Sequence, residues 1–198
     1  KATQNDTERK LAYKFLGEIL RIETLHELVF MCGNHDILSD RKNKDISKEN
    51  NSFDTLHKFI ESLAPELANK VTYLKEQKQY ISKYSQKLGW IAYSLEDGFS
   101  NGNNINWELI DNSIYNISVF HDIVRDYVED SKLPVRKDKL QRLPYIADFK
   151  TELILSADIH KDYTKTIDGK TFIYPGSTNQ VNFGEGSFIK VRKNSTIF

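Results

Sequence analysis

The feature that most constrains the fold of this chain is a short apolar strand pattern that ends in glycine directly after an amphipathic helix. Residues 7–22 carry apolar side chains at helical spacing, and residues 27–32 then form a short apolar run that ends at Gly33. A run of this length without alternation is typical of a strand buried on both faces, as in the parallel sheets of α/β proteins. The chain is therefore predicted to be an α/β protein.

Further strand and helix patterns fill the rest of the chain, whose 198 residues suit one domain spanning 1–198. The first three strands named below are expected to be antiparallel. Residues 129–144, which are rich in lysine and arginine, are expected to form a basic surface loop. Helices are expected at 52–63 and, as one short turn, at 107–110, and strands at 71–74, 79–83, 88–94, 114–120, 151–156, 171–174 and 187–191.

Composition excludes several classes of protein. Lysine and arginine number 28, and aspartate and glutamate also number 28, so the formal net charge is zero. This balance excludes a basic protein that coats nucleic acid and leaves only local patches to bind phosphate. A mean hydropathy of −0.56 and the lack of an 18-residue apolar run exclude a membrane span. The single cysteine, Cys32, cannot form an internal disulfide, which favours a cytoplasmic protein.

The tetrapeptide Gly33-Asn34-His35-Asp36 follows the first predicted strand and has the residue types that a metal and phosphate site needs. Glycine allows a sharp turn, and the side-chain carbonyl oxygen of Asn34 is a neutral ligand for a hard divalent ion. His35 is positioned to contact a phosphate, and Asp36 can orient it through a hydrogen bond. The alternative is a capped turn that has no chemical role.

More potential metal ligands follow two later strands. His121 ends one strand, and Asp158 and His160 follow the next. Because alternate residues on an extended backbone point the same way, Asp158 and His160 are expected to face one cluster. Amide, imidazole and carboxylate ligands together suit Mn²⁺, Fe²⁺ or Zn²⁺ in a two-metal site. His26 and His57, which lie before a strand and within a helix, are expected to be structural.

Five short motifs occur in order along the chain. They are Gly33-Asn34-His35-Asp36, Val119-Phe120-His121, Ala157-Asp158-Ile159-His160-Lys161, Tyr174-Pro175-Gly176-Ser177 and Asn182-Phe183-Gly184-Glu185. In this order they resemble the later motifs of calcineurin-like metallophosphoesterases. The last two motifs together resemble the SbcD-type nuclease subunit of double-strand-break repair and its phage recombination relatives. The resemblance implies an α/β fold of the metallophosphoesterase type, a two-sheet β-sandwich flanked by helices.

The resemblance also implies roles for the residues that match the family's motifs. Asn34 and His121 match ligands of one metal, and His160 matches a ligand of the other. His35, oriented by Asp36, matches the histidine that stabilises or protonates the leaving group. Asp158 stands where most of the family has a histidine, and it can still bind the metal. The implied cofactors are two divalent ions, Mn²⁺ first, with Mg²⁺, Fe²⁺ or Zn²⁺ as alternatives.

Part of the family's site has no counterpart in this sequence. The Asp-x-His and Gly-Asp-x-x-Asp motifs, which supply most ligands of the first metal and the bridging carboxylate, would precede residue 8 and do not occur. The chain is therefore expected to be a fragment that lacks the N-terminal strands of the fold. As a nuclease it is expected to be inactive or nearly so.

The resemblance thus predicts a metal-dependent phosphodiesterase that acts on DNA as an exonuclease or endonuclease in repair and recombination. The implied partners are DNA, a second copy of the chain and an SbcC-like ATPase. Two alternatives remain open: a phosphoesterase for a small phosphomonoester or cyclic nucleotide, and a degenerate scaffold that binds a protein partner without chemistry. The residues expected to bind DNA phosphates are Arg41, Lys42, Arg136, Lys137 and Lys139.

Overall fold

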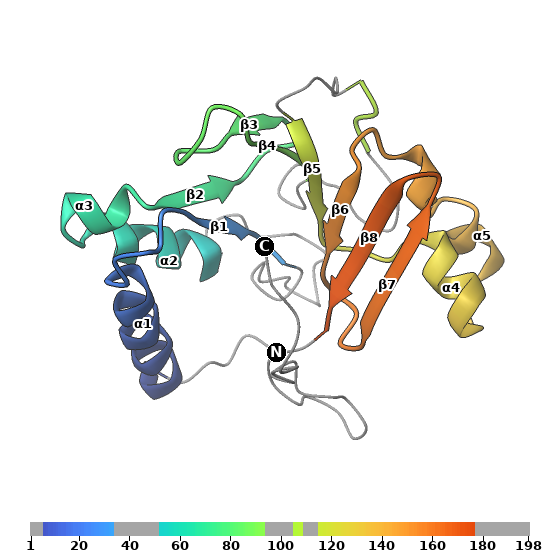
Figure 1. Cartoon of the computed structure of the whole chain (residues 1–198). Helices are drawn as coiled ribbons and strands as arrows, with labels where there is room; N and C mark the ends of the chain where they lie inside the picture. Colours follow the sequence, from blue (N-terminus) through green and yellow to red (C-terminus); the bar gives the residue numbers. More distant parts are fainter. Residues whose placement is uncertain (1–5, 34–51, 94–104, 109–114, 177–198) are drawn as a thin grey trace, which may run out of the picture.

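The chain has a mixed α/β architecture with a two-stranded and a six-stranded sheet (Figure 1). The computed structural model describes residues 6–33, 52–93, 105–108 and 115–176. The α/β class predicted from the sequence is confirmed. The elements are α1 (Asp6–Leu20), β1 (Leu28–Met31), α2 (Ser52–Glu61), α3 (Pro65–Ala68), β2 (Val71–Leu74), β3 (Gln79–Ile81), β4 (Gly89–Tyr93), β5 (Tyr115–Phe120), α4 (Arg125–Ser131), α5 (Lys137–Leu140), the 3-10 turn η3 (Ile146–Asp148), β6 (Leu153–Ser156), β7 (Asp162–Ile167) and β8 (Lys170–Pro175).

The six-stranded sheet has the order β3-β4-β5-β6-β8-β7. Its four central strands, β4, β5, β6 and β8, run parallel, and each edge strand is antiparallel to its neighbour. Fully buried apolar side chains from all four central strands form the main core, among them Ile91, Phe120, Ile154 and Phe172. Because the central strands are parallel, their carboxyl ends meet at one edge of the sheet, which is where ligands bind in open α/β sheets.

The two-stranded sheet pairs β1 with β2 in parallel. Helices α1 and α2 lie beside it (Figure 1), and their apolar faces bury Leu16, Leu20 and Ile60 with Val71 of β2. The prediction that 71–74 pairs as an antiparallel strand with its successors is therefore wrong, because this strand pairs with β1 across a long connection. All four residues of β1 are half-buried rather than fully buried.

Strand β7 and its hairpin to β8 were not predicted from the sequence. Asp168 and Gly169 join the two strands with φ angles of 50° and 80°. Both angles lie in the left-handed region, which an Asp-Gly pair adopts readily in a two-residue hairpin turn. Half-buried and exposed residues alternate along β7, as expected for an edge strand with one face on the core. The Asp-Gly pair is thus the signal in the sequence that could have identified this hairpin.

The prediction of a basic loop over 129–144 is wrong. This segment contains the end of α4 and all of α5, and Leu143 is buried in the core with Val135 and Leu140 packed against it. Lys132, with a φ of 53°, ends α4, and the amide of Leu133 donates a hydrogen bond back to Val128. The lysines and arginines lie on the outer side of a folded segment, because its apolar residues anchor it.

Two further predicted elements lie partly or wholly outside the described residues. Of the short helical turn expected at 107–110, the structure describes residues 107–108, which form a turn, and the strand expected at 187–191 lies outside the described residues. Among the helices that are described, none is long and apolar enough to cross a membrane.

Candidate functional site

His121 and Asp158 meet at the carboxyl edge of the six-stranded sheet. Strands β5 and β6 are adjacent and parallel, with Phe120 paired in register with Ser156. The residues that follow these strands therefore leave the sheet side by side, and Nε2 of His121 lies 3.8 Å from Oδ1 of Asp158. The two side chains are only 17% and 28% exposed. The sequence prediction that these two residues share a site is consistent with this geometry.

The end of β1 reaches the same edge from the other sheet. A Cβ atom added to Gly33 would lie 3.0 Å from Cε1 of His121 and 3.3 Å from its Nδ1. A side chain at this position would therefore require the His121 ring to move by a few tenths of an ångström, which glycine avoids. The backbone that leads directly into Asn34, His35 and Asp36 therefore starts against His121, whereas those three residues lie outside the described residues.

Asp158 has a φ of 81°, so the backbone is not extended at this residue. The premise that Asp158 and His160 alternate on an extended backbone is therefore wrong, and their shared cluster stays a prediction. β6 ends at Ser156, and both residues lie in the loop that follows, where each is half-buried. Aspartate is among the few residues that adopt a left-handed conformation at modest cost, which explains how the loop turns without glycine at this position.

Glu27 forms a second polar centre, just before β1. Its carboxylate accepts hydrogen bonds from the hydroxyls of Thr72 and Ser82 and from the amide of Lys83. Burial opposes its ionisation, but the hydrogen bonds from Ser82, Thr72 and the amides of Lys83 and Tyr84 outweigh burial and lower the pKa of Glu27. Sequence analysis did not identify this centre, because its hydrogen-bond donors lie at least 45 residues away along the chain.

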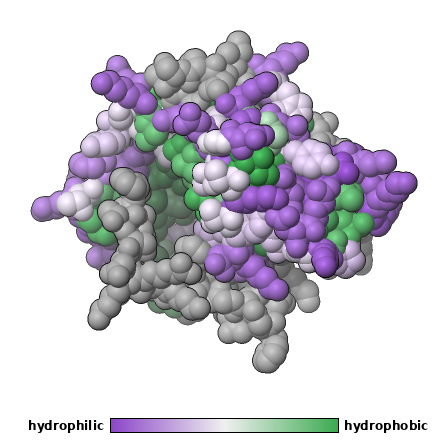
Figure 2. All heavy atoms as spheres, turned by 45° about the vertical axis from the view of Figure 1, so that its right-hand side comes forward, coloured by the Kyte–Doolittle hydropathy of each residue, from purple (hydrophilic) through white to green (hydrophobic). Residues whose placement is uncertain are grey.

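The structure describes three of the five basic residues predicted to bind DNA. Arg41 and Lys42 lie outside the described residues. Lys137 and Lys139 lie on α5, and Arg136 immediately precedes this helix. Nη2 of Arg136 lies 2.9 Å from Asp138, so one carboxylate offsets part of this charge. The surface on this side of the molecule is mostly hydrophilic in Figure 2.

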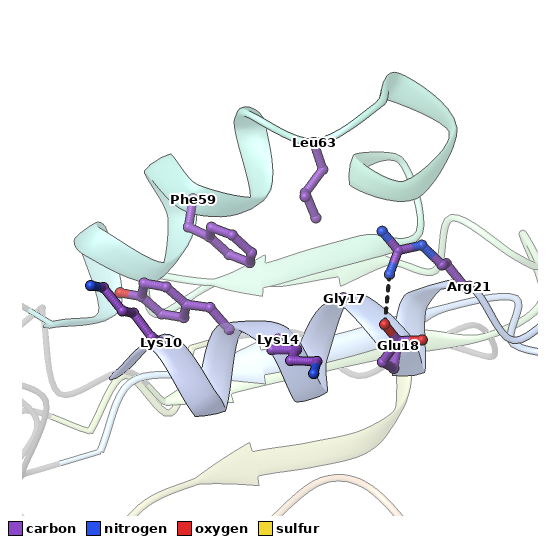
Figure 3. Close-up of a pocket in the computed structure, with 8 residues that line it drawn as sticks. Lys10, Lys14, Gly17, Glu18, Arg21, Phe59 and Leu63 are labelled. Carbon is purple, nitrogen blue, oxygen red and sulfur yellow. Dashed lines mark hydrogen bonds and ion pairs between the residues drawn. The ribbon is translucent and has the colours of Figure 1, made fainter. Parts of the chain in front are cut away.

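A groove of about 480 Å³ lies between α1 and α2 (Figure 3). The rings of Tyr13 and Phe59 stack 4.4 Å apart in it, and Arg21 is paired with Glu18 on its rim. None of the predicted site residues lines this groove. The candidate site is therefore the sheet edge and not this groove.

The two histidines expected to be structural both pack against aromatic rings. The ring of His26 stacks on that of Tyr84 with ring centres 4.3 Å apart, and the ring centres of His57 and Tyr73 are 4.1 Å apart. The Nδ1 atom of His57 also lies 2.9 Å from Nζ of Lys75. These contacts are consistent with the structural interpretation of His26 and His57.

A carboxylate oxygen and an imidazole nitrogen, half-buried and side by side, are donors that suit Mn²⁺ and related divalent ions. Within the described part of the chain, no group of three or more histidine, cysteine, aspartate or glutamate side chains is arranged to hold a metal. His121 and Asp158 thus offer two donors. No protein-family model matches the chain, and a search of curated proteins finds no match.

Proposed function

We propose that this chain carries metal-ligating and phosphate-binding residues of a phosphodiesterase that acts on DNA, as the nuclease subunit of an SbcD-type repair or recombination complex. The observation that carries the proposal is the convergence of three distant segments. Gly33 packs against His121, and His121 lies 3.8 Å from Asp158. Each of these residues belongs to one of the motifs that resemble metallophosphoesterases. The two sheets support the finer proposal of a metallophosphoesterase-type sandwich.

The proposed ligands fit a pair of divalent ions. Asp158 and His121, with Asn34, would hold one ion, and His160 would be a ligand of the other. When bound, such ions lower the pKa of water and polarise the phosphate. Because Asp158 brings an anionic oxygen where an imidazole nitrogen would be neutral, the site should prefer Mn²⁺ or Mg²⁺ to Zn²⁺.

The chain's other residues would bind and orient the DNA. Arg136, Lys137 and Lys139 supply positive charge for backbone phosphates, together with Arg41 and Lys42. His35 would donate a hydrogen bond or a proton to the leaving oxygen, and Asp36 would fix the orientation of its ring. The roles proposed for Asn34, His35 and Asp36 require that the segment after Gly33 stays close to His121.

DNA binding that depends on Mn²⁺ tests this function. We expect Mn²⁺ to tighten the binding of a fluorescent linear duplex to the wild-type chain by about tenfold, because bound Mn²⁺ would add positive charge where a backbone phosphate binds. His121→Ala should abolish this gain. His26→Ala, which removes a histidine that stacks on Tyr84, is the matched control and should retain it.

Two other outcomes would overturn the proposal in different directions. If Mn²⁺ improved the binding of a cyclic nucleotide or a phosphomonoester and not of DNA, the site would serve a small substrate. If neither substrate bound with or without Mn²⁺, the fold would be a scaffold for a protein partner.

The proposed assembly contains a second copy of the chain and an SbcC-like ATPase in the cytoplasm. Leu11 and Phe15, one turn apart on α1, are 63% and 68% exposed and offer an apolar surface to the second copy. Sedimentation should show a dimer that Phe15→Asp converts to a monomer. A wild-type chain that sediments as a monomer at high concentration would remove the second copy from this proposal.

A further inference from the structure

Two buried hydroxyl groups converge on the turn that follows His121. The hydroxyl of Tyr174 donates a hydrogen bond to the carbonyl oxygen of Asp122 and accepts one from the amide of Val124, each 2.9 Å long. The hydroxyl of Ser156 donates to the same carbonyl oxygen at 2.8 Å. Tyr174 is 1% exposed and Ser156 is 4% exposed. One carbonyl group thus accepts hydrogen bonds from two neighbouring strands.

These contacts connect the two loops that carry the candidate ligands. Ser156 is the last residue of β6 and lies two positions before Asp158. Its hydroxyl binds the residue directly after His121, and the amide of Ala157 donates to the carbonyl oxygen of Phe120 at 3.3 Å. The backbones on either side of the His121 and Asp158 pair are therefore tied to one another.

Packing alone does not require a hydroxyl group at position 174. Phe172 lies two residues earlier on the same face of β8, is fully buried, and contacts Tyr174 with ring centres 4.6 Å apart. A phenylalanine at 174 would fill the same volume. A buried hydroxyl without partners costs free energy, so the Tyr174 hydroxyl is compatible with burial because Asp122 and Val124 bind it.

We propose that Tyr174 and Ser156 are positioning residues, whose hydroxyl groups fix the turn after His121. The fixed turn keeps the His121 imidazole beside Asp158 and against Gly33. Tyr127 contacts the Tyr174 ring edge-on at 5.3 Å and limits its movement. The consequence for metal binding rests on the function proposed above. The fixed orientation of His121 does not, because it is a property of the chain without metal.

Tyr174→Phe tests the proposal, with Tyr163→Phe as the matched control. Tyr163 is a partly buried tyrosine of the same aromatic cluster, and its hydroxyl donates a hydrogen bond of 2.7 Å to Asp130 on α4. Both variants lose a tyrosine hydroxyl, so both should unfold at a lower temperature. Only Tyr174→Phe should shift the NMR signals of the His121 ring and weaken its nuclear Overhauser contact with Gly33. It should also raise the Mn²⁺ dissociation constant about tenfold, whereas Tyr163→Phe should leave it unchanged.

Ser156→Ala is the second variant and removes the other hydrogen bond to Asp122. It should move the His121 signals in the same way, so the proposal can be tested even if Tyr174→Phe does not fold. Unchanged His121 signals in the folded variants would overturn the proposal and leave these hydroxyls with a purely structural role. If the wild-type chain bound no Mn²⁺, the metal site would be refuted, and the His121 signals of the metal-free chain would still decide the positioning role.

Discussion

The two ends of β1 both contact residues that follow strands of the six-stranded sheet, and they do so by different chemistry. Before the strand, Glu27 accepts hydrogen bonds from Thr72 and from the Ser82 and Lys83 segment after β3. After it, Gly33 packs directly on the His121 ring, beside Asp158. Neutral hydrogen-bond donors surround the Glu27 carboxylate and lower its pKa. The Asp158 carboxylate lies beside the His121 imidazole, and its residue has a left-handed backbone conformation. The neutral donors around Glu27 give its carboxylate a place in the fold, whereas the pair of His121 and Asp158 is the one that we propose binds a metal.

The largest effect should come from Asp158→Asn, which keeps the shape of the side chain and tolerates the positive φ but removes the charge. We expect the Mn²⁺ dissociation constant to rise by about 100-fold, more than the loss of a supporting residue usually causes. Calorimetric titration measures it. Asp158→His should restore binding and shift selectivity toward Zn²⁺. Equal Mn²⁺ affinity in the wild type and Asp158→Asn would show that Asp158 is not a ligand.

Gly33→Ala should cost about tenfold in Mn²⁺ affinity, because its Cβ would push the His121 ring from its place. Gly169→Ala is the control that separates crowding from backbone strain. Gly169 has a φ of 80° and nothing within 4 Å of an added Cβ, so its substitution should cost about 1 kcal/mol of stability and no affinity. Titration and thermal unfolding of both variants should show these opposite patterns. Loss of affinity in both would mean that general destabilisation explains the result.

Glu27→Gln should lower the free energy of unfolding at pH 7 by about 1 kcal/mol, since solvent screens part of the charge. The folded-state pKa of Glu27 lies below its ordinary value of 4.5. Its contribution is therefore present above that value and is lost as the pH falls through the lower, folded-state pKa. Denaturant unfolding of the two proteins should give curves that differ at pH 7 and converge in acid. A constant difference at every pH would contradict the role of the Glu27 charge, and Mn²⁺ affinity should not change.

The smallest effect concerns the basic residues at α5. Replacing Arg136, Lys137 and Lys139 with alanine should weaken DNA binding uniformly across sequences and reduce the salt slope by about 2. One of the three charges is partly offset by Asp138, which limits the effect. The control is a chain with alanine at Lys10, Lys14 and Lys58, which loses the same net charge from α1 and α2. The same change in slope for both variants would leave α5 without a specific role.

How much could be predicted from the sequence differed between the two ends of β1. The helix and strand before Gly33 follow from local apolar periodicity, and the structure has them as α1 and β1. The meeting of His121 with Asp158 follows from parallel strands sharing one edge. The Glu27 centre could not be predicted, because Thr72 and Ser82 approach it only through tertiary packing. The left-handed Asp158 was also missed, since no glycine marks the turn.

The hydrogen bonds of Tyr174 and Ser156 behind His121 could not be predicted from the sequence either. Tyr174 was recognised only as part of a motif, because its hydroxyl acts on residues that lie 50 and 52 positions earlier. The basic segment 129–144 was misread for a different reason. Its basic residues recur at short intervals, and the few apolar residues that anchor it, such as Leu143, have no clear periodicity.

Paramagnetic broadening of the histidine signals by Mn²⁺ tests the central claim most directly, that His121 and Asp158 belong to one metal site. The chain has five histidines, and His26 and His57 pack on the aromatic rings of Tyr84 and Tyr73. Substoichiometric Mn²⁺ should broaden the ring signal of His121 first, with those of His35 and His160, while His26 and His57 keep their intensity. Uniform broadening of all five signals, or earlier loss of His26 or His57, would contradict the claim.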